Sequence, residues 1–251
     1  MSIIFNGRAF AREKEIEIEK RVKTLKEKGI ISCLASILIG DDPASKLYVG
    51  LKKKAAERVG IRLEVFDSVD EIGRLNRDKN VHGIMIQLPL PDAILNSKLQ
   101  ILNSIKPEKD VDGLRKDSPF VHPTAMAVLQ VIEIAKSLLT VHRSPFTICV
   151  VGKTGMVGSA LLREIRNTDY KLVEKSEDAD ILVSATGSPN IIKANMVKKG
   201  AIVIDVGSPK GDIDPSCYEV AGFVTPVPGG IGPITISCLL ENLIVSAGKV
   251  C

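Results

Sequence analysis

The chain has 251 residues, of which 45% are hydrophobic, so it is long enough for one large domain or two of ordinary size. Its net charge of +4 decides little about partners, but an aromatic content of only 4% argues against stacking platforms for nucleic acid. The five cysteines are far apart and form no CxxC pair, which favours free thiols in a reducing compartment over a disulfide or zinc framework. We therefore expect a cytoplasmic protein that does not bind nucleic acid.

Two apolar stretches could suggest a membrane protein, but neither fits a membrane span. Residues 29–40 are too few to cross a bilayer, and residues 220–240 are interrupted by prolines and glycines. The N-terminus becomes charged at Arg8, which is unlike a signal peptide. We therefore expect a soluble protein without a membrane partner.

The first part of the chain alternates predicted helices and strands. The predicted elements are a charged amphipathic helix over 8–28, strand 31–39, helix 44–59, strand 63–66, a further helix, strand 81–87 and helix 96–104. Alternation of this kind predicts a parallel sheet with helices on its faces.

The second part of the chain repeats this alternation. Its predicted elements are helix 123–137, strand 147–151, a glycine-rich turn with a helix ending near residue 166, a short strand 170–173, strands 181–185 and 201–206, and an apolar helix 234–247. The fold class is therefore α/β, with domains over residues 1–119 and 120–235. A C-terminal helix, 236–251, is expected to pack back on the first domain. A ligand cleft is expected between the domains, near the carboxyl ends of strands.

A glycine-rich turn, residues 152–158, connects a strand to a helix in the second domain. Glycines here let the backbone approach a pyrophosphate at the helix N-terminus, although the spacing is GxxGxxG rather than GxGxxG, and a tight turn without a ligand is a comparable interpretation. Glycines at two further strand ends, 185–187 and 205–207, strengthen the prediction of a Rossmann-like domain. The predicted cofactor-binding residues are Gly152, Lys153, Thr154, Gly155, Val157, Gly158, Thr186, Gly187 and Gly207.

The second strand–helix unit of this domain is predicted to be shortened. Only seven residues, 174–180, separate the short strand from the next one, whereas a parallel crossover with its helix needs about ten to twelve. This unit normally carries the groups that bind the adenosine ribose. Lys153, Lys171 and Lys175 could bind a 2′-phosphate, and Glu174 could accept a ribose hydroxyl. For the last three of these four, solvated surface charge is the favoured interpretation.

Tyr48 and Lys52 are the main candidates for chemistry. They are four residues apart in the predicted helix 44–59, so both project from one face and could together transfer protons. Lys52 belongs to the run 52–54, and lysine runs usually mark a solvated helix face. The three lysines point in different directions, however, and only Lys52 lies one turn from Tyr48.

Three loops carry further candidates. Gln87 ends an apolar strand, where a polar residue either meets a ligand or caps the sheet edge. Asp110 and Asp112 lie in a tight loop, where aspartate is also common as a turn former. Residues 226–233 contain three prolines and three glycines, which predicts a rigid loop that either approaches a ligand or simply connects domains.

Six strings of the sequence together resemble one known family. In chain order they are ASKLYVGLKKKAAERVGI, GIMIQLPLP, PEKDVDG, VVGKTGMVG, GAIVIDVG and TPVPGGIGPIT. They are similar to those of the bifunctional methylenetetrahydrofolate dehydrogenase/methenyltetrahydrofolate cyclohydrolase family, and the match covers nearly the whole chain. The resemblance implies NADP-dependent oxidation of methylenetetrahydrofolate, hydrolysis of the methenyl product to formyltetrahydrofolate, a homodimer and no metal.

The resemblance also implies roles for individual residues. Lys52 would be the catalytic lysine, Gln87 would hydrogen-bond it and tune its protonation, and Tyr48 would help to place the substrate. Asp112 would bind the pterin-like ring of the folate. The residues expected to border folate and nicotinamide are Pro228, Gly229 and Gly230.

One departure from the family concerns the cofactor. Lys153 stands where the family carries arginine, so the charge is kept but the planar fork is lost. With the shortened unit, this leaves NAD open beside NADP. Two alternative functions also stay open at this point. One is a dehydrogenase that has lost hydrolysis, against which Lys52 and Gln87 argue, and the other is a folate- or nucleotide-binding protein without turnover.

Overall fold

The computed structural model describes residues 2–139 and 145–249, which form two compact units. The first unit comprises Arg12–Pro123 with Ile236–Cys251, and the second comprises Met1–Ala11 with Thr124–Thr235. Residues 1–11, which were expected in the first domain, group with the second unit by their contacts. They belong to the second unit because strand β1 (Ile3–Ile4) pairs in parallel with β9 (Phe223–Val224).

The first unit contains a three-stranded parallel sheet in the order β3-β2-β4. The strands are β2 (Cys33–Ile37), β3 (Arg62–Phe66) and β4 (Gly83–Ile86). Every residue of β2 is buried, as expected for a central strand covered on both faces. Successive side chains enter different cores, because Leu34 packs on one face while Cys33 and Ala35 pack on the other.

Helices cover both faces of this sheet. Those of the first unit are α2 (Pro43–Arg58), α3 (Ile72–Arg77), α4 (Asp92–Leu95) and α5 (Lys98–Asn103), with the 3-10 helices η1 (Val69–Glu71) and η2 (Pro107–Lys109). The start of α2 follows from its sequence: the Asp42 carboxylate accepts a hydrogen bond of 2.7 Å from the Ser45 amide, and Pro43 occupies the first turn.

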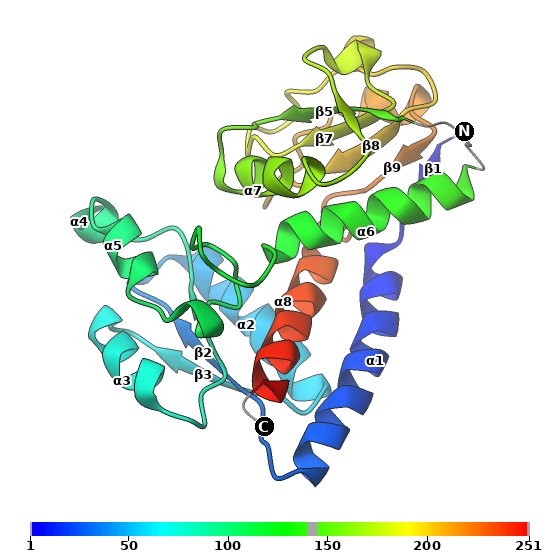
Figure 1. Cartoon of the computed structure of the whole chain (residues 1–251). Coiled ribbons are helices and arrows are strands. Elements are labelled where there is room, and N and C mark those ends of the chain that lie inside the picture. The colour runs from blue at the N-terminus through cyan, green and yellow to red at the C-terminus, as the bar shows by residue number, and fades with distance from the viewer. Residues whose placement is uncertain (1, 140–144, 250–251) are drawn as a thin grey trace. The chain divides into compact units, whose positions relative to one another are not determined.

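Two long helices, α1 (Gly7–Glu27) and α8 (Ile231–Gly248), begin in the second unit and continue into the first (Figure 1). Ile18 of α1 and Leu239 and Leu243 of α8 belong to one buried cluster of the first unit. The C-terminal helix therefore packs within that unit. Among the described residues, α8 is also the helix whose length and composition would suit a membrane span, but 61% of that stretch is buried inside the protein. Its apolar character is accounted for by this core.

The second unit contains a six-stranded parallel sheet in the order β1-β9-β8-β7-β5-β6 (Figure 1). Besides β1 and β9, its strands are β5 (Thr147–Val151), β6 (Lys171–Leu172), β7 (Ile181–Ser184) and β8 (Ile202–Asp205). The strand order reverses at β5, because the next strand in the chain pairs on one side of it and β7 pairs on the other. Ligands of doubly wound sheets bind at such a switch point, beyond the carboxyl ends of the strands.

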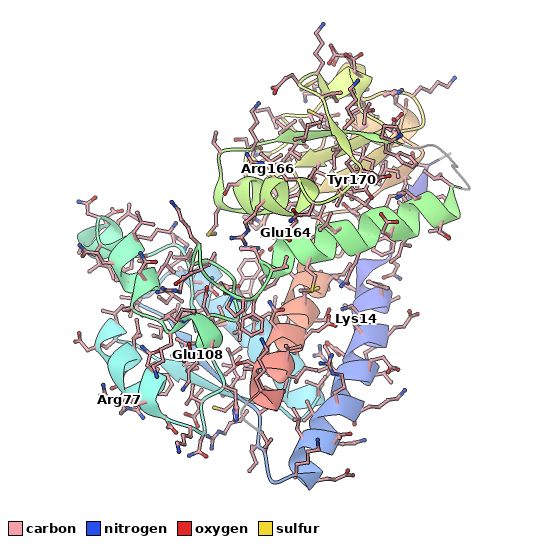
Figure 2. All side chains as sticks on the ribbon, in the orientation of Figure 1. Lys14, Arg77, Glu108, Glu164, Arg166 and Tyr170 are labelled. Carbon is pink, nitrogen blue, oxygen red and sulfur yellow. The ribbon has the colours of Figure 1, made fainter. Side chains whose placement is uncertain are left out.

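The remaining elements of the second unit are α6 (Pro123–Leu138), α7 (Met156–Ile165), η3 (Ser176–Asp178), η4 (Ala194–Met196) and η5 (Pro215–Glu219). The predicted shortening is confirmed: β6 has two residues, and the three-residue η3 stands where a crossover helix would be. Tyr170, which precedes β6, lies beside α6 (Figure 2). Its hydroxyl donates to Glu133, and the Lys136 ammonium lies 5.2 Å from the centre of its ring. These contacts hold α6 against the edge of the sheet.

Candidate active site

Lys52 and Gln87 meet at the carboxyl edge of the sheet in the first unit. The Nζ atom of Lys52, on α2, donates a hydrogen bond of 2.9 Å to Oε1 of Gln87, which directly follows β4. The Gln87 side-chain amide donates in turn to the Leu88 carbonyl at 2.8 Å, and its backbone amide donates to the Ile37 carbonyl at 2.8 Å. The acceptor for the lysine is therefore fixed by the sheet itself.

The burial of Lys52 distinguishes it from the other lysines of its run. Lys53 and Lys54 are exposed, whereas Lys52 is half-buried. Burial lowers the pKa of Lys52 below its ordinary value of 10.5, and the negative charge of Asp112 opposes part of this effect. A lysine whose pKa is lowered carries more of its neutral form near neutral pH, so it can both accept and return a proton.

The two aspartates of the loop after η2 have different surroundings. Asp110 is buried, and its carboxylate accepts a hydrogen bond of 2.9 Å from the Arg115 amide. Its own carbonyl accepts from the Ser118 hydroxyl, so Asp110 holds the loop in shape. Asp112 is half-buried and is the aspartate whose charge acts on Lys52. Tyr48 is half-buried one turn before Lys52 on α2.

In the glycine-rich turn of the second unit, backbone atoms of other residues lie directly against two of the glycines. A Cβ at Gly152, whose φ is +84°, would lie 2.4 Å from the Ala185 carbonyl oxygen at the end of β7. A Cβ at Gly158 would lie 2.2 Å from the carbonyl oxygen of Gly152. Neither position has room for a side chain. The turn therefore brings the start of α7 and the ends of β5 and β7 together at the switch point.

This turn fits a dinucleotide pyrophosphate. The N-cap of α7, a helix of ten residues, is Gly155, which has no side chain that could accept from the amides of the first turn. Those amides can bind an anion, and the glycines allow the close approach. Lys153, Thr154 and Gly155 are exposed, Val157 is half-buried, and Lys153 adds a positive charge. The residues thus suit the phosphates of a nicotinamide dinucleotide.

Two buried carboxylates at the carboxyl ends of β7 and β8 were missed by the sequence-based prediction. The Asp212 carboxylate accepts from the Ser184 hydroxyl at 2.8 Å and from the Thr186 amide at 2.7 Å, so it fixes the turn that includes Thr186 and Gly187. Its Oδ1 atom has no hydrogen-bond partner among the residues the structure describes. Asp205 accepts from the amide of Gly207 at 2.8 Å. A polar residue at the end of an apolar strand, such as Asp205, was the available signal.

The loop with Pro228, Gly229 and Gly230 lies against the start of α1, within the second unit. A Cβ at Gly7 would lie 1.9 Å from the Gly230 carbonyl oxygen, so the helix begins in direct contact with the loop. Gly229 has a φ of +105°, which an L side chain rarely adopts, and the Gly230 amide donates to the Pro226 carbonyl at 2.8 Å. The loop is therefore irregular backbone held in contact with the start of α1.

The predicted site residues are divided between the units. The first unit holds Tyr48, Lys52, Gln87 and Asp112. The second holds the nine predicted cofactor-binding residues and the loop 228–230. Each group lies at the carboxyl edge of a parallel sheet or in a loop next to one. The cleft between the domains stays a prediction.

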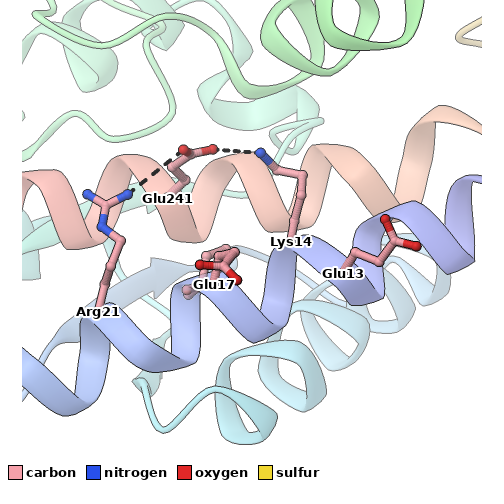
Figure 3. Close-up of a pocket in the computed structure, with 6 residues that line it drawn as sticks. Glu13, Lys14, Glu17, Arg21 and Glu241 are labelled. Atoms are coloured by element: carbon pink, nitrogen blue, oxygen red, sulfur yellow. Dashed lines mark hydrogen bonds and ion pairs between the residues drawn. The ribbon is translucent and has the colours of Figure 1, made fainter. Parts of the chain in front are cut away.

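A surface groove of the first unit is lined by other residues, and it does not resemble a ligand site. It is lined by Glu13, Lys14, Glu17, Ile18, Arg21 and Glu241, from α1 and α8 (Figure 3). Glu241 lies 2.8 Å from the Lys14 ammonium and 3.9 Å from the Arg21 guanidinium. Glu241 of α8 thus pairs with two cations of α1, while Glu17 pairs with Lys20 outside the groove.

Comparison with known proteins gives a consistent picture over both units. The model of the tetrahydrofolate dehydrogenase/cyclohydrolase catalytic domain matches residues 5–112, and that of the NAD(P)-binding domain matches residues 123–250. The bifunctional protein FolD of Anoxybacillus flavithermus is 38% identical over 97% of this chain and 97% of its own.

Two solved structures show the same architecture. The bifunctional FolD of Campylobacter jejuni superposes with a TM-score of 0.88 at 33% identity, over 99% of both chains. The FolD of Trypanosoma brucei, solved with NADP and an inhibitor, gives 0.87 at 30% identity, over 99% of this chain and 98% of its own. The chain therefore belongs to the tetrahydrofolate dehydrogenase/cyclohydrolase family.

Proposed function

We propose that the protein oxidises methylenetetrahydrofolate to methenyltetrahydrofolate with NADP and then hydrolyses the methenyl product to formyltetrahydrofolate. The observation that carries this proposal is the hydrogen bond of 2.9 Å between Lys52 and Gln87. A generic dehydrogenase of small hydroxy acids would not need a lysine of lowered pKa held by a fixed amide. When bound, NADP supplies the acceptor for the hydride in the first reaction.

Lys52 is the proposed acid and base of the hydrolytic reaction. Its neutral amine accepts a proton from the water that attacks the methenyl carbon, and its ammonium form can return a proton as the ring C–N bond breaks. Oε1 of Gln87 holds the amine in one direction, so less reorientation is needed when the proton moves. Asp112 keeps the pKa of Lys52 from falling as far as burial alone would take it.

The oxidation mainly requires positioning, because the hydride passes directly between two carbon atoms. Tyr48 and Asp112 are proposed to place the folate. The glycine-rich turn and the start of α7 are proposed to hold the pyrophosphate of the cofactor, and Asp212 fixes the turn at Thr186 against which it would bind. The loop 228–230 is proposed to border the folate and the nicotinamide.

We also propose a cytoplasmic homodimer. The four cysteines within the described residues, Cys33, Cys149, Cys217 and Cys238, are buried free thiols, which is typical of a reducing compartment. The dimer is proposed from the family resemblance. NADP is supported by the NAD(P)-binding domain match and by the NADP bound to the Trypanosoma brucei relative.

The test is a comparison of initial rates of methylenetetrahydrofolate oxidation with NADP and with NAD, followed by loss of the methenyl absorbance in a separate assay. We expect oxidation and hydrolysis in the same preparation. Oxidation without hydrolysis would favour the dehydrogenase that has lost its second activity. The absence of both reactions, with folate still bound, would favour a binding protein.

A further inference from the structure

Lys153 and Glu174 form an ion pair beside the proposed pyrophosphate site. The Nζ atom of Lys153 lies 2.6 Å from Oε2 of Glu174. Their side chains are 51% and 86% exposed, so both charged groups are accessible to a ligand. Lys153 belongs to the glycine-rich turn after β5, and Glu174 follows β6, the neighbouring strand. The pair therefore joins the carboxyl ends of two adjacent parallel strands.

The backbone position of Glu174 is set by the pairing of β6 with β5 and does not depend on the Glu174 side chain. The amide of Val173 donates to the Ile148 carbonyl at 3.0 Å, which continues the pairing of β6 with β5. The carbonyl of Glu174 itself accepts a weak hydrogen bond from the Cys149 thiol at 3.6 Å. The crossover that follows Glu174 contains only the three-residue η3. The backbone of Glu174 therefore stays near the end of β6, and its carboxylate contacts the Lys153 amine of the glycine-rich turn.

This is the place where a dinucleotide fold distinguishes its two cofactors. An acidic residue about 20 residues after the glycine turn accepts the ribose 2′-hydroxyl of NAD, whereas a cation at this place binds the 2′-phosphate of NADP. Glu174 is the twenty-second residue after Gly152. In this chain the two kinds of group are both present and are paired with each other.

We propose that Glu174 sets the balance between NAD and NADP in this protein. Its carboxylate accepts the 2′-hydroxyl of NAD. Toward NADP it acts in the opposite sense, because it repels the 2′-phosphate and occupies the amine of Lys153 that would otherwise bind this phosphate. The preference for NADP that Lys153 alone would give is therefore reduced. The inference rests on the dinucleotide site of the proposed function.

The exposure of the pair makes an exchange of partners feasible. An ion pair between solvent-exposed side chains contributes little to folding stability, so Lys153 can leave Glu174 for a phosphate at little cost to the fold. The Glu174 carboxylate would repel a phosphate bound by Lys153, and this repulsion weakens as the salt concentration rises. Cofactor preference, and not stability, is the property that Glu174 should control.

The experiment measures the dissociation constants of NAD and of NADP for the full chain by calorimetry, without folate. The variants are Glu174→Gln, which removes the charge but keeps the shape, and Glu177→Gln as a matched control. Glu177 is exposed in η3 and carries the same charge. We expect Glu174→Gln to strengthen NADP binding relative to NAD by about tenfold at low salt, and by less at high salt. Glu177→Gln should change the ratio of the two constants little.

A second variant isolates the role of the lysine. Lys153→Met should weaken NADP binding much more than NAD binding, and adding Glu174→Gln to it should restore only part of the loss. The inference is overturned if Glu174→Gln changes both constants equally, or changes their ratio no more than Glu177→Gln does. If the unaltered protein binds neither cofactor, the dinucleotide site of the proposed function is wrong, and the inference falls with it.

Discussion

The ammonium of Lys52 and the side-chain oxygen of Gln87 are 2.9 Å apart, although 35 residues separate them in the chain. Gln87 cannot turn away without breaking its bond to the Leu88 carbonyl, so the strand edge dictates where the amine points. The lysine is thus held by a neutral group that does not force it to stay protonated. A carboxylate in the same place would have the opposite effect.

Removal of the amine should separate the two reactions. We expect Lys52→Ala to lower the rate of hydrolysis by about 10²- to 10⁴-fold, the usual contribution of a general acid or base, while hydride transfer is partly retained. Lys53→Ala is the matched control, because Lys53 is exposed on the next position of α2. Both rates are measured spectrophotometrically on each variant. Undiminished hydrolysis in Lys52→Ala would contradict the role given to this lysine.

Replacement of the amide by a carboxylate should shift the pH dependence of hydrolysis. In Gln87→Glu the new negative charge favours the ammonium form, so the pKa of Lys52 rises and less neutral amine is present near pH 7. The rate should then fall at neutral pH, and its rise with pH should move to higher values. The pH–rate profile of hydrolysis is the measurement. A profile that does not move would show that Lys52 does not govern it.

The glycine-rich turn should not tolerate a side chain at Gly158. The Cβ would lie 2.2 Å from a backbone oxygen, so either α7 or the turn must shift. We expect Gly158→Ala to lower the free energy of unfolding by about 1–3 kcal/mol and to weaken cofactor binding. The control is Gly232→Ala in α8, where a Cβ would meet no atom within 4 Å. Denaturant unfolding and calorimetry give the two quantities. Equal behaviour of the two variants would contradict the close contact.

Glu15 should make the stability of the protein depend on pH. Burial raises the pKa of this carboxyl, but hydrogen bonds from Arg58 and Arg12 outweigh that effect and hold the pKa below its ordinary value of 4.5. Its contribution to stability is therefore complete above pH 4.5 and is lost as the pH falls through the lower folded-state value. We expect Glu15→Gln to cost about 1–3 kcal/mol at neutral pH and progressively less in acid.

The control for this prediction is Glu17→Gln. Glu17 is 69% exposed and pairs with Lys20 on the surface of α1. Its substitution should change the free energy of unfolding by less than about 0.5 kcal/mol. Urea unfolding at several pH values measures both variants. A difference between Glu15→Gln and the unaltered protein that stays constant into acid would contradict the assigned role.

Long, strongly patterned elements could be predicted from the sequence because their pattern is local. Strand β5 has the predicted bounds, and α2 begins one residue before the predicted start, where Asp42 caps it. The two-residue strands β1 and β9 were missed, since two residues carry no periodicity; β6, also of two residues, was predicted as part of the longer stretch 170–173. Their pairing is also what assigns residues 1–11 to the second unit.

The residue types of the candidate site were predictable from the sequence, whereas the hydrogen bond between Lys52 and Gln87 was expected only from the family resemblance and is present in the structure. The polar ends of apolar strands pointed to Gln87, and helical spacing pointed to Lys52. Their hydrogen bond depends on how α2 packs on the sheet, which no local pattern contains. Asp212 was missed for a related reason. It lies in a loop, and its importance comes from accepting the Ser184 hydroxyl and the Thr186 amide, which belong to a distant part of the sequence.

The packing of α8 has a consequence for synthesis on the ribosome. Leu239, Leu243 and Ala247 complete the buried cluster to which Ile18 and Val59 also belong. While the chain is synthesised, the strands and early helices of the first unit are made long before α8, because most of the second unit lies between them in the sequence. The nascent first unit therefore exposes an apolar face until α8 is available, and this is the interval in which a chaperone would bind it.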